Sequence, residues 1–109
     1  MINRSVLMVR PKGPYLDWAT NLSGEDVTEY LQEDERTVYL IPEYADSDES
    51  EQYLREAYGY IFEEELNAWH TDQSAWPKVR DLKTFKEWFA VEFHSVVLDL
   101  GSGPIRDDE

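Results

Sequence analysis

The sequence contains no cysteine, which excludes disulfide bonds, zinc–thiolate sites, iron–sulfur clusters and a thiol nucleophile. Long hydrophobic runs are missing too, since no apolar stretch approaches the roughly 18 residues that a membrane-spanning helix needs. The apolar stretch at residues 5–10 is too short, and wrongly flanked, for a signal peptide. These absences predict a cytoplasmic protein.

Basic residues are scarce: 10 Lys and Arg face 24 Asp and Glu, for a formal net charge of −14. Residues 25–75 carry sixteen acids and only two bases, whereas residues 1–24 and 76–106 are close to neutral. A strongly acidic surface repels phosphate backbones and anionic lipids. We therefore expect no nucleic-acid partner and no membrane partner, and the charge favours a basic protein as partner.

The length of 109 residues allows one domain. Hydrophobic residues make up 41% of the chain and aromatic residues 14%, which is enough for a true core. A chain of this size can bury about two-thirds of its unfolded surface. We predict a single compact α+β domain over residues 1–100 and a polar, flexible C-terminal tail over residues 101–109.

Three segments have strand patterns. Residues 5–10 are rich in β-branched side chains, and Pro11 ends this run because proline cannot donate to a sheet ladder. Residues 36–41 are apolar on both faces, which predicts a central strand. Residues 93–100 form the third predicted strand. One face of this strand carries His94, Val96, Leu98 and Leu100, and the other carries Phe93, Ser95, Val97 and Asp99.

A long helix is predicted to end at about Trp69, with Ser47 or Asp48 as its N-cap. Glu51 and Arg55 have the spacing of a favourable pair one turn apart. Side chains at helical spacing form its predicted buried face: Leu54, Ala57, Tyr58, Ile61, Phe62, Leu66 and Trp69.

Two shorter helices complete the predicted elements. The first begins at Pro14 and has Tyr15, Trp18, Ala19 and Leu22 on its apolar side. The other is capped by Asp81 and runs to about Ala90. In residues 25–35, Val27, Tyr30 and Leu31 have helical spacing, but the stretch is short and heavily acidic, so we interpret it as a helical turn or a loop.

The element order is therefore β-α-β-α-α-β, without an internal repeat. This order predicts an α+β fold, or a small α/β fold, in which about three helices pack on a three-stranded sheet. The first strand–helix–strand unit fits a right-handed parallel crossover, and an antiparallel third strand is equally compatible with the pattern. Three strands leave two edges, so a structural role as a homodimer formed through a strand edge is one functional hypothesis.

Only two histidines are present, His70 and His94. The ordinary role of His70 is that of a cation at a helix C-terminus, where the helix dipole stabilises it. A metal site built from both histidines, Glu92 and Asp72 would require two distant segments to meet, and the dense ligand spacing typical of metal sites is missing. We predict neither a metal nor a cofactor.

Motifs of catalysis are also missing: the sequence has no G-x-S-x-G turn and no phosphate-binding glycine loop. Asp46, Asp48 and Ser50 alternate like the start of a calcium loop. However, Glu51 stands where that loop needs glycine, and Ala57 stands where it needs glutamate. We therefore assign no catalytic residue and lean toward a non-enzymatic protein.

Ten of the fifteen aromatic residues lie between Tyr53 and Phe93. Most of them belong in the core, but Tyr60, Trp69 and Trp76 are difficult to place inside together. One interpretation is an aromatic and acidic surface that binds a basic partner, since tyrosine and tryptophan favour interfaces. The other interpretation is an ordinary core with a loop anchored by tryptophan.

The first functional hypothesis is a protein-binding module, for example one that neutralises a basic partner or mimics nucleic acid. Glu49, Glu56 and Glu63 recur every seven residues along the long helix, with Tyr60 beside them, and are the predicted interface. A merely solvated helix face would have the same pattern. The alternative hypothesis is an enzyme or small-ligand binder with a pocket formed by Trp69, His70, Asp72, Trp76 and His94.

Four stretches in the last two-fifths of the chain carry a resemblance: WHTD at 69–72, WP at 76–77, FKEWF at 85–89 and VEFHSV at 91–96. With these stretches the chain resembles small acidic bacterial proteins of uncharacterised function. The resemblance implies a bacterial cytoplasmic protein and supplies no catalytic residues.

Overall fold

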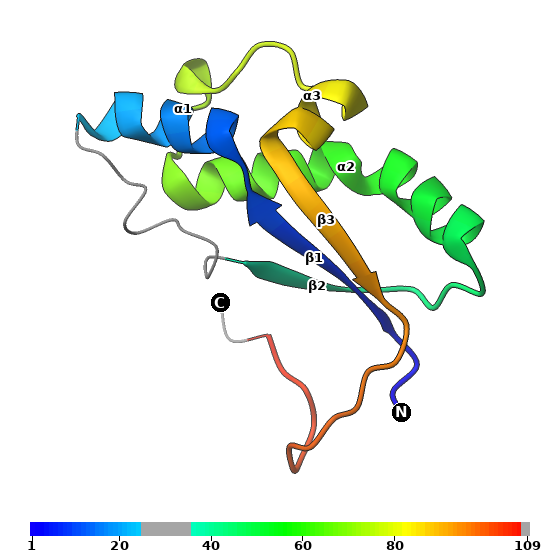
Figure 1. The fold of residues 1–109 in the computed structure, drawn as a ribbon. Helices are drawn as coiled ribbons and strands as arrows, with labels where there is room; N and C mark the ends of the chain where they lie inside the picture. The colour runs from blue at the N-terminus through cyan, green and yellow to red at the C-terminus, as the bar shows by residue number, and fades with distance from the viewer. Residues whose placement is uncertain (25–35, 108–109) are drawn as a thin grey trace.

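The computed structural model describes residues 1–24 and 36–107. Along the chain lie β1 (Ser5–Pro11), α1 (Gly13–Ser23), β2 (Thr37–Ile41), α2 (Ser47–Trp69), a 3-10 turn at Gln73–Ala75, α3 (Leu82–Trp88) and β3 (Phe89–His94). This order confirms the predicted β-α-β-α-α-β arrangement and the α+β class (Figure 1). The helical turn or loop predicted at residues 25–35 lies outside the described residues.

The three strands are ordered β2-β1-β3, and both pairs are antiparallel. The predicted parallel crossover is therefore wrong, whereas the alternative of an antiparallel third strand is confirmed. The predicted central position of residues 36–41 is also wrong, because β2 is an edge strand and its Val38 and Leu40 side chains are 54% and 48% exposed. The central strand is β1, in which Leu7 and Val9 are completely buried.

One face of the sheet carries the core. Helix α2 runs across this face, and α1 and α3 pack beside it (Figure 1). Alternate strand residues such as Leu7, Ile41 and Phe89 point toward the helices. They join one cluster with buried side chains of the helices and the loop after α2: Tyr15, Leu54, Ile61, Phe62, Leu66, Trp76 and Phe85. The opposite face carries Met8, Val38 and Glu92, and no described helix packs on it.

Strand β3 begins four residues earlier than predicted and ends at His94. The chain passes from α3 to β3 without a loop, because Phe89 is both the C-cap of the helix and the first strand residue. Its N–H still bonds to the Phe85 carbonyl, while its side chain is buried against the sheet. The predicted strand residues Val96, Leu98 and Leu100 lie beyond the sheet and are exposed.

The N-cap of α2 is Asp46, not Ser47 or Asp48 as predicted. Asp46 Oδ1 accepts a 2.9 Å hydrogen bond from the Glu49 N–H, and the Glu49 carboxylate accepts a 2.5 Å bond from the Ala45 N–H. This reciprocal pair satisfies free donors at the start of the helix. The Asp81 cap of α3 is confirmed by a 2.8 Å bond from the Thr84 N–H.

Helix α2 has 23 residues and packs through one apolar side. Four of the seven residues predicted to be buried are so, namely Leu54, Ile61, Phe62 and Leu66, while Ala57, Tyr58 and Trp69 are half-buried. Glu51 pairs with Lys86 of α3 at 2.6 Å rather than with Arg55, so its partner comes from another helix. None of the described helices is both long enough and apolar enough to cross a membrane.

Candidate functional site

Acidic and tyrosine side chains surround an opening at the start of α2. After β2 the chain continues from Pro42 beside the first turns of α2. The connection and the helix together line an open hollow of about 260 Å³. We call it the acidic hollow; its lining residues are Pro42, Glu43, Tyr44, Glu49, Gln52, Tyr53 and Glu56. Three carboxylates and two phenol rings thus meet at one opening whose lining contains no basic residue.

Packing fixes the two rings of the acidic hollow. Tyr44 stands edge-on to Phe93 of β3, with ring centroids 5.8 Å apart and an interplanar angle of 81°. Tyr53 is half-buried against the core. The Glu56 carboxylate accepts a 3.2 Å hydrogen bond from the Gln52 amide one turn earlier. Helix α2 therefore holds Glu49, Tyr53 and Glu56, and the contact with Phe93 holds the Tyr44 ring, which keeps the loss of their side-chain entropy on binding small.

The predicted acidic stripe lies on the exposed side of α2. Glu49, Glu56 and Glu63 are all exposed, and so is 67% of Tyr60. A spacing of seven residues is close to two helical turns, so the stripe follows the helix axis. The structure places Glu49 and Glu56 in the acidic hollow and leaves Glu63 outside its lining.

Sequence reasoning missed Glu43, Tyr44 and Tyr53, although they complete the acidic hollow. The first two come from the connection after β2, and only the return of that connection beside α2 brings them to the helix. The one sequence signal was an acid followed by a tyrosine directly after a strand and a proline.

A second hollow, of about 170 Å³, lies where β1 ends and α2 passes the start of β2. It is called the Glu65 hollow; its lining residues are Pro11, Tyr15, Arg36, Thr37, Glu65, Ala68 and Trp69. The Glu65 carboxylate accepts hydrogen bonds from the Tyr39 hydroxyl at 2.6 Å and from the Thr37 hydroxyl at 3.2 Å. The Tyr15 hydroxyl donates to the Glu65 carbonyl at 2.8 Å.

Burial raises the pKa of Glu65, and this effect exceeds the lowering by its two hydroxyl donors. Burial likewise raises the pKa values of Tyr39 and Tyr15, and the nearby Glu65 charge raises them further. Sequence reasoning missed Glu65 because it is the last of three consecutive glutamates, and only the fold distinguishes it from the exposed Glu63 and Glu64.

Four residues of the alternative pocket lie together at the end of α2. His70 caps the helix through its N–H, which bonds to the Leu66 carbonyl at 2.9 Å. The Trp76 indole donates to the His70 carbonyl at 2.8 Å and is itself only 7% exposed. Asp72 accepts from the hydroxyl of Ser74 at 2.7 Å and from its N–H at 3.0 Å, and these bonds lower the pKa of Asp72.

His94, the fifth residue of that pocket, lies elsewhere. It pairs with Val6 at the start of β1, and its ring lies 3.3 Å from the Glu92 carboxylate. The loop that contains Trp76 instead contacts α1, which follows the other end of β1, through a 2.9 Å bond from the Trp18 indole to the Ala75 carbonyl. A strand of seven residues spans about 20 Å, so the structure does not bring His94 to the other four residues. The end of β3 and the C-terminal end of α2 accordingly lie at opposite ends of the sheet (Figure 1).

Across residues 1–24 and 36–107, no group of three or more acidic or histidine side chains is arranged to hold a metal ion. No protein-family model, curated protein or solved structure matches the chain. Its functional assignment therefore depends on the acidic hollow, the Glu65 hollow and the surfaces beside them.

Proposed function

We propose that the chain is a protein-binding module that takes a basic segment of another protein into the acidic hollow. The observation that carries this proposal is the convergence of Glu43, Glu49 and Glu56 with Tyr44 and Tyr53 around one opening. Carboxylates pair with lysine or arginine, and the faces of phenol rings attract the same cations. The arrangement supports a basic side chain as the group that is bound.

The size of the acidic hollow supports a side chain rather than a free small molecule. Its volume of about 260 Å³ is below the range of roughly 300–1,000 Å³ that is typical of drug-sized ligand pockets. Its lining residues come from the surface of a helix and the strand connection beside it. A partner would insert one basic side chain here and lie along α2, where Tyr60 and Glu63 extend the contact surface.

The charge of the whole chain supports the same class of partner. A net charge of −14 accelerates the diffusional encounter with a basic protein, and this acceleration weakens with salt. Neutralisation of a basic partner and occupation of a basic cleft that normally takes nucleic acid are two concrete forms of the function.

The test is a fluorescence-anisotropy titration of a labelled arginine-rich peptide, with a glutamate-rich peptide as the negative control. The double variant Glu43→Gln, Glu56→Gln removes two charges from the acidic hollow. The matched variant Asp17→Asn, Glu87→Gln removes two exposed charges from α1 and α3. We expect the first variant to weaken binding about tenfold more than the second, because only the first loses direct pairs with the bound cation.

A second comparison separates a site from a general charge effect. Tyr53→Leu keeps the net charge and removes the ring, so it weakens binding further if the cation lies against that ring. Equal losses in the two charge variants, together with unchanged binding by Tyr53→Leu, would show that the peptide responds only to net charge. That result would disprove the acidic hollow as the site.

The Glu65 hollow supports a second candidate function, acid–base chemistry on a ligand of fragment size, since its volume of about 170 Å³ is below the range of pockets for drug-sized ligands. A carboxyl whose pKa is raised by burial is suited to hold and release a proton beside a ligand. Trp69 lines the same hollow, so a ligand bound there shifts its indole N–H signal in two-dimensional NMR. A fragment screen read at that signal, assigned with Trp69→Phe, tests this function; no shift at saturating fragment concentration removes it.

A further inference from the structure

Strand β3 has a free edge that presents hydrogen-bonding groups. The register pairs Arg10 with Ala90, and beyond Pro11 the Lys12 N–H bonds to the Trp88 carbonyl at 2.8 Å. Hydrogen-bonded pairs alternate along an antiparallel ladder, so Ala90 also bonds toward β1, while Val91 and Phe93 direct their N–H and C=O groups outward. In the described part of the chain, no strand or loop pairs with this edge.

A hollow of about 360 Å³, lined by four apolar side chains and one ion pair, lies directly beside this edge on the helix side of the sheet. We call it the β3 hollow; its lining residues are Glu51, Leu54, Lys86, Phe89, Val91 and Phe93. The Glu51–Lys86 ion pair joins α2 to α3 at this hollow. A strand added to β3 would therefore gain both backbone hydrogen bonds and apolar contacts.

The sequence of β3 has little of the usual protection of an edge strand, since Glu92 is its one acidic or basic residue apart from His94. Soluble proteins block such edges with charged side chains, especially lysine, with proline or bulges, or with very short strands. Strand β3, FAVEFH, contains neither lysine nor proline. By contrast, Pro42 follows directly after the other edge strand, β2, which has only five residues. Strand β2, TVYLI, also contains neither lysine nor proline, so what distinguishes the β3 edge is the hollow beside it and the Arg10 and Glu92 side chains.

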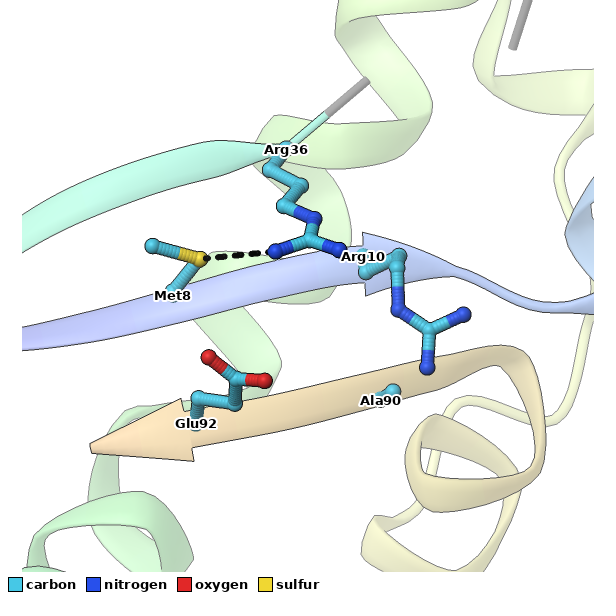
Figure 2. A pocket seen from close by; sticks show the side chains of 5 residues that line it. All are labelled: Met8, Arg10, Arg36, Ala90 and Glu92. Carbon is cyan, nitrogen blue, oxygen red and sulfur yellow. Dashed lines mark hydrogen bonds between the residues drawn. The ribbon is translucent and has the colours of Figure 1, made fainter. Parts of the chain in front are cut away.

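On the open face of the sheet, a positive and a negative side chain flank the same edge. Figure 2 shows the Arg10 side chain reaching from β1 toward β3 beside Ala90, with Glu92 next along that strand. The short side chain of Ala90 leaves the space between Arg10 and the edge of β3 open. Among the described residues, Arg10 forms no ion pair with Glu92.

We propose that a second copy of this chain pairs antiparallel with the β3 edge, with Val91 opposite Val91 of the second copy. This register places Phe89 opposite Phe93 and Ala90 opposite Glu92 of the second copy. The Glu92 carboxylate of one copy then lies beside Ala90 of the other, where the Arg10 side chain points. Two symmetric Arg10–Glu92 pairs form, and the three-stranded sheets join into one sheet of six strands.

Charge selects both the occupant and the register. Sliding each copy by one residue places Glu92 opposite Glu92, and like charges directly opposite each other destabilise a strand pair. In the two-fold dimer, Arg10 and Glu92 of each copy both pair with a residue of opposite charge in the other copy. A foreign strand would offer both charges in these positions only by chance. The β3 hollows of both copies lie on the same side of the joined sheet. Each copy therefore covers apolar side chains beside the β3 hollow of the other copy. This proposal does not depend on the acidic hollow.

The test measures the oligomeric state of the full chain by sedimentation velocity over a range of concentrations. We expect a dimer whose dissociation constant rises about tenfold or more in Arg10→Glu and in Glu92→Arg, because each loses two pairs and gains two like-charge contacts. The double variant Arg10→Glu, Glu92→Arg restores the pairs with reversed sign and should recover most of the dimer. Circular dichroism verifies that each variant folds.

A measurement on the unmodified chain keeps the test decisive if a variant does not fold. Hydrogen exchange at the Val91 and Phe93 amides should slow as the protein concentration increases, because only pairing covers them. The variant Val38→Lys, Leu40→Lys alters the β2 edge and should leave the dimer unchanged.

Three results would overturn the proposal. The first is a monomer at every concentration. The second is a dimer that is lost in the β2-edge variant (Val38→Lys with Leu40→Lys) but not in Glu92→Arg. The third is a failure of the charge-reversed double variant (Arg10→Glu with Glu92→Arg) to recover the dimer. Protection of Val91 and Phe93 only on addition of an unrelated extended peptide, with the chain still monomeric, would assign the edge to a foreign strand instead.

Discussion

The Tyr39 hydroxyl donates a 2.6 Å hydrogen bond to the Glu65 carboxylate and so connects edge strand β2 to helix α2. Thr37 donates to the other oxygen of the same carboxylate. A single half-buried acid therefore receives two hydroxyl donors from one strand, and its charge is stabilised by hydrogen bonds rather than by a described ion pair.

The pKa of Glu65 determines the sign of its contribution to stability. The folded state raises this pKa above the ordinary value of 4.5, so the folded protein holds the proton at higher pH than the unfolded chain does. The stabilisation is fully present below the unfolded value and is lost as pH rises through the folded value. Glu65→Gln stays neutral and can still accept from Tyr39, so its free energy of unfolding should exceed that of the wild type at neutral pH.

Urea unfolding at a series of pH values measures this difference, which should vanish as the pH falls below 4.5. Glu63→Gln is the matched control: its carboxylate is exposed, so its curve should run parallel to that of the wild type. Glu65→Ala leaves both hydroxyls without their partner and should cost about 1–3 kcal/mol. A difference between Glu65→Gln and wild type that stays constant with pH would contradict the raised pKa.

Asp46→Ala should lower the free energy of unfolding by about 1 kcal/mol, because it removes the side-chain acceptor that caps α2. Asp48→Ala is the control, since Asp48 is an exposed first-turn acid that acts only through the helix dipole. Its expected cost is about 0.3 kcal/mol. Chemical denaturation followed by circular dichroism compares the two variants; an equal loss in both would argue against Asp46 as the cap.

Local patterns predicted the elements, but strand order depended on a long-range pairing. Residues 36–41 were predicted to be central because both of their faces are apolar, but the run in residues 5–10 is similarly apolar. What makes β1 central is β3, which joins it from the far end of the chain. The boundary between α3 and β3 was also hidden, because Phe89 continues the helical spacing from Phe85 and begins the alternation of the strand.

The residues of the candidate site also divide into those that a local pattern predicted and those that only the fold identifies. Glu49 and Glu56 were found from their seven-residue spacing, which is a property of one helix. Glu43 enters the acidic hollow through the return of the chain after β2, and no local pattern encodes that return. Glu65 required knowledge of which of three adjacent glutamates faces the sheet, and the helix phase against β2 decides this.

Lys86→Ala should lower the free energy of unfolding by about 0.2–1 kcal/mol, because it breaks the Glu51–Lys86 pair at 2.6 Å. The effect is small because both side chains are partly exposed, by 48% and 36%. Arg55→Ala is the matched control, since it removes the cation that sequence spacing assigned to Glu51. Urea denaturation at low and high salt should show a loss of stability that depends on salt for Lys86→Ala and not for Arg55→Ala. A salt-dependent loss for Arg55→Ala alone would show that Glu51 pairs with Arg55 instead.

Trp76→Phe should destabilise the fold by about 1–2 kcal/mol, because it leaves the His70 carbonyl without its indole donor while it retains an apolar ring. His70→Ala should change stability little, since the loop is bound to the main-chain carbonyl of that residue and not to its imidazole. Thermal unfolding followed by circular dichroism compares the two variants, and NMR should show the Trp76 indole N–H protected from exchange. A larger loss in His70→Ala than in Trp76→Phe would show that the imidazole anchors the loop and would return His70 to the candidate binding residues.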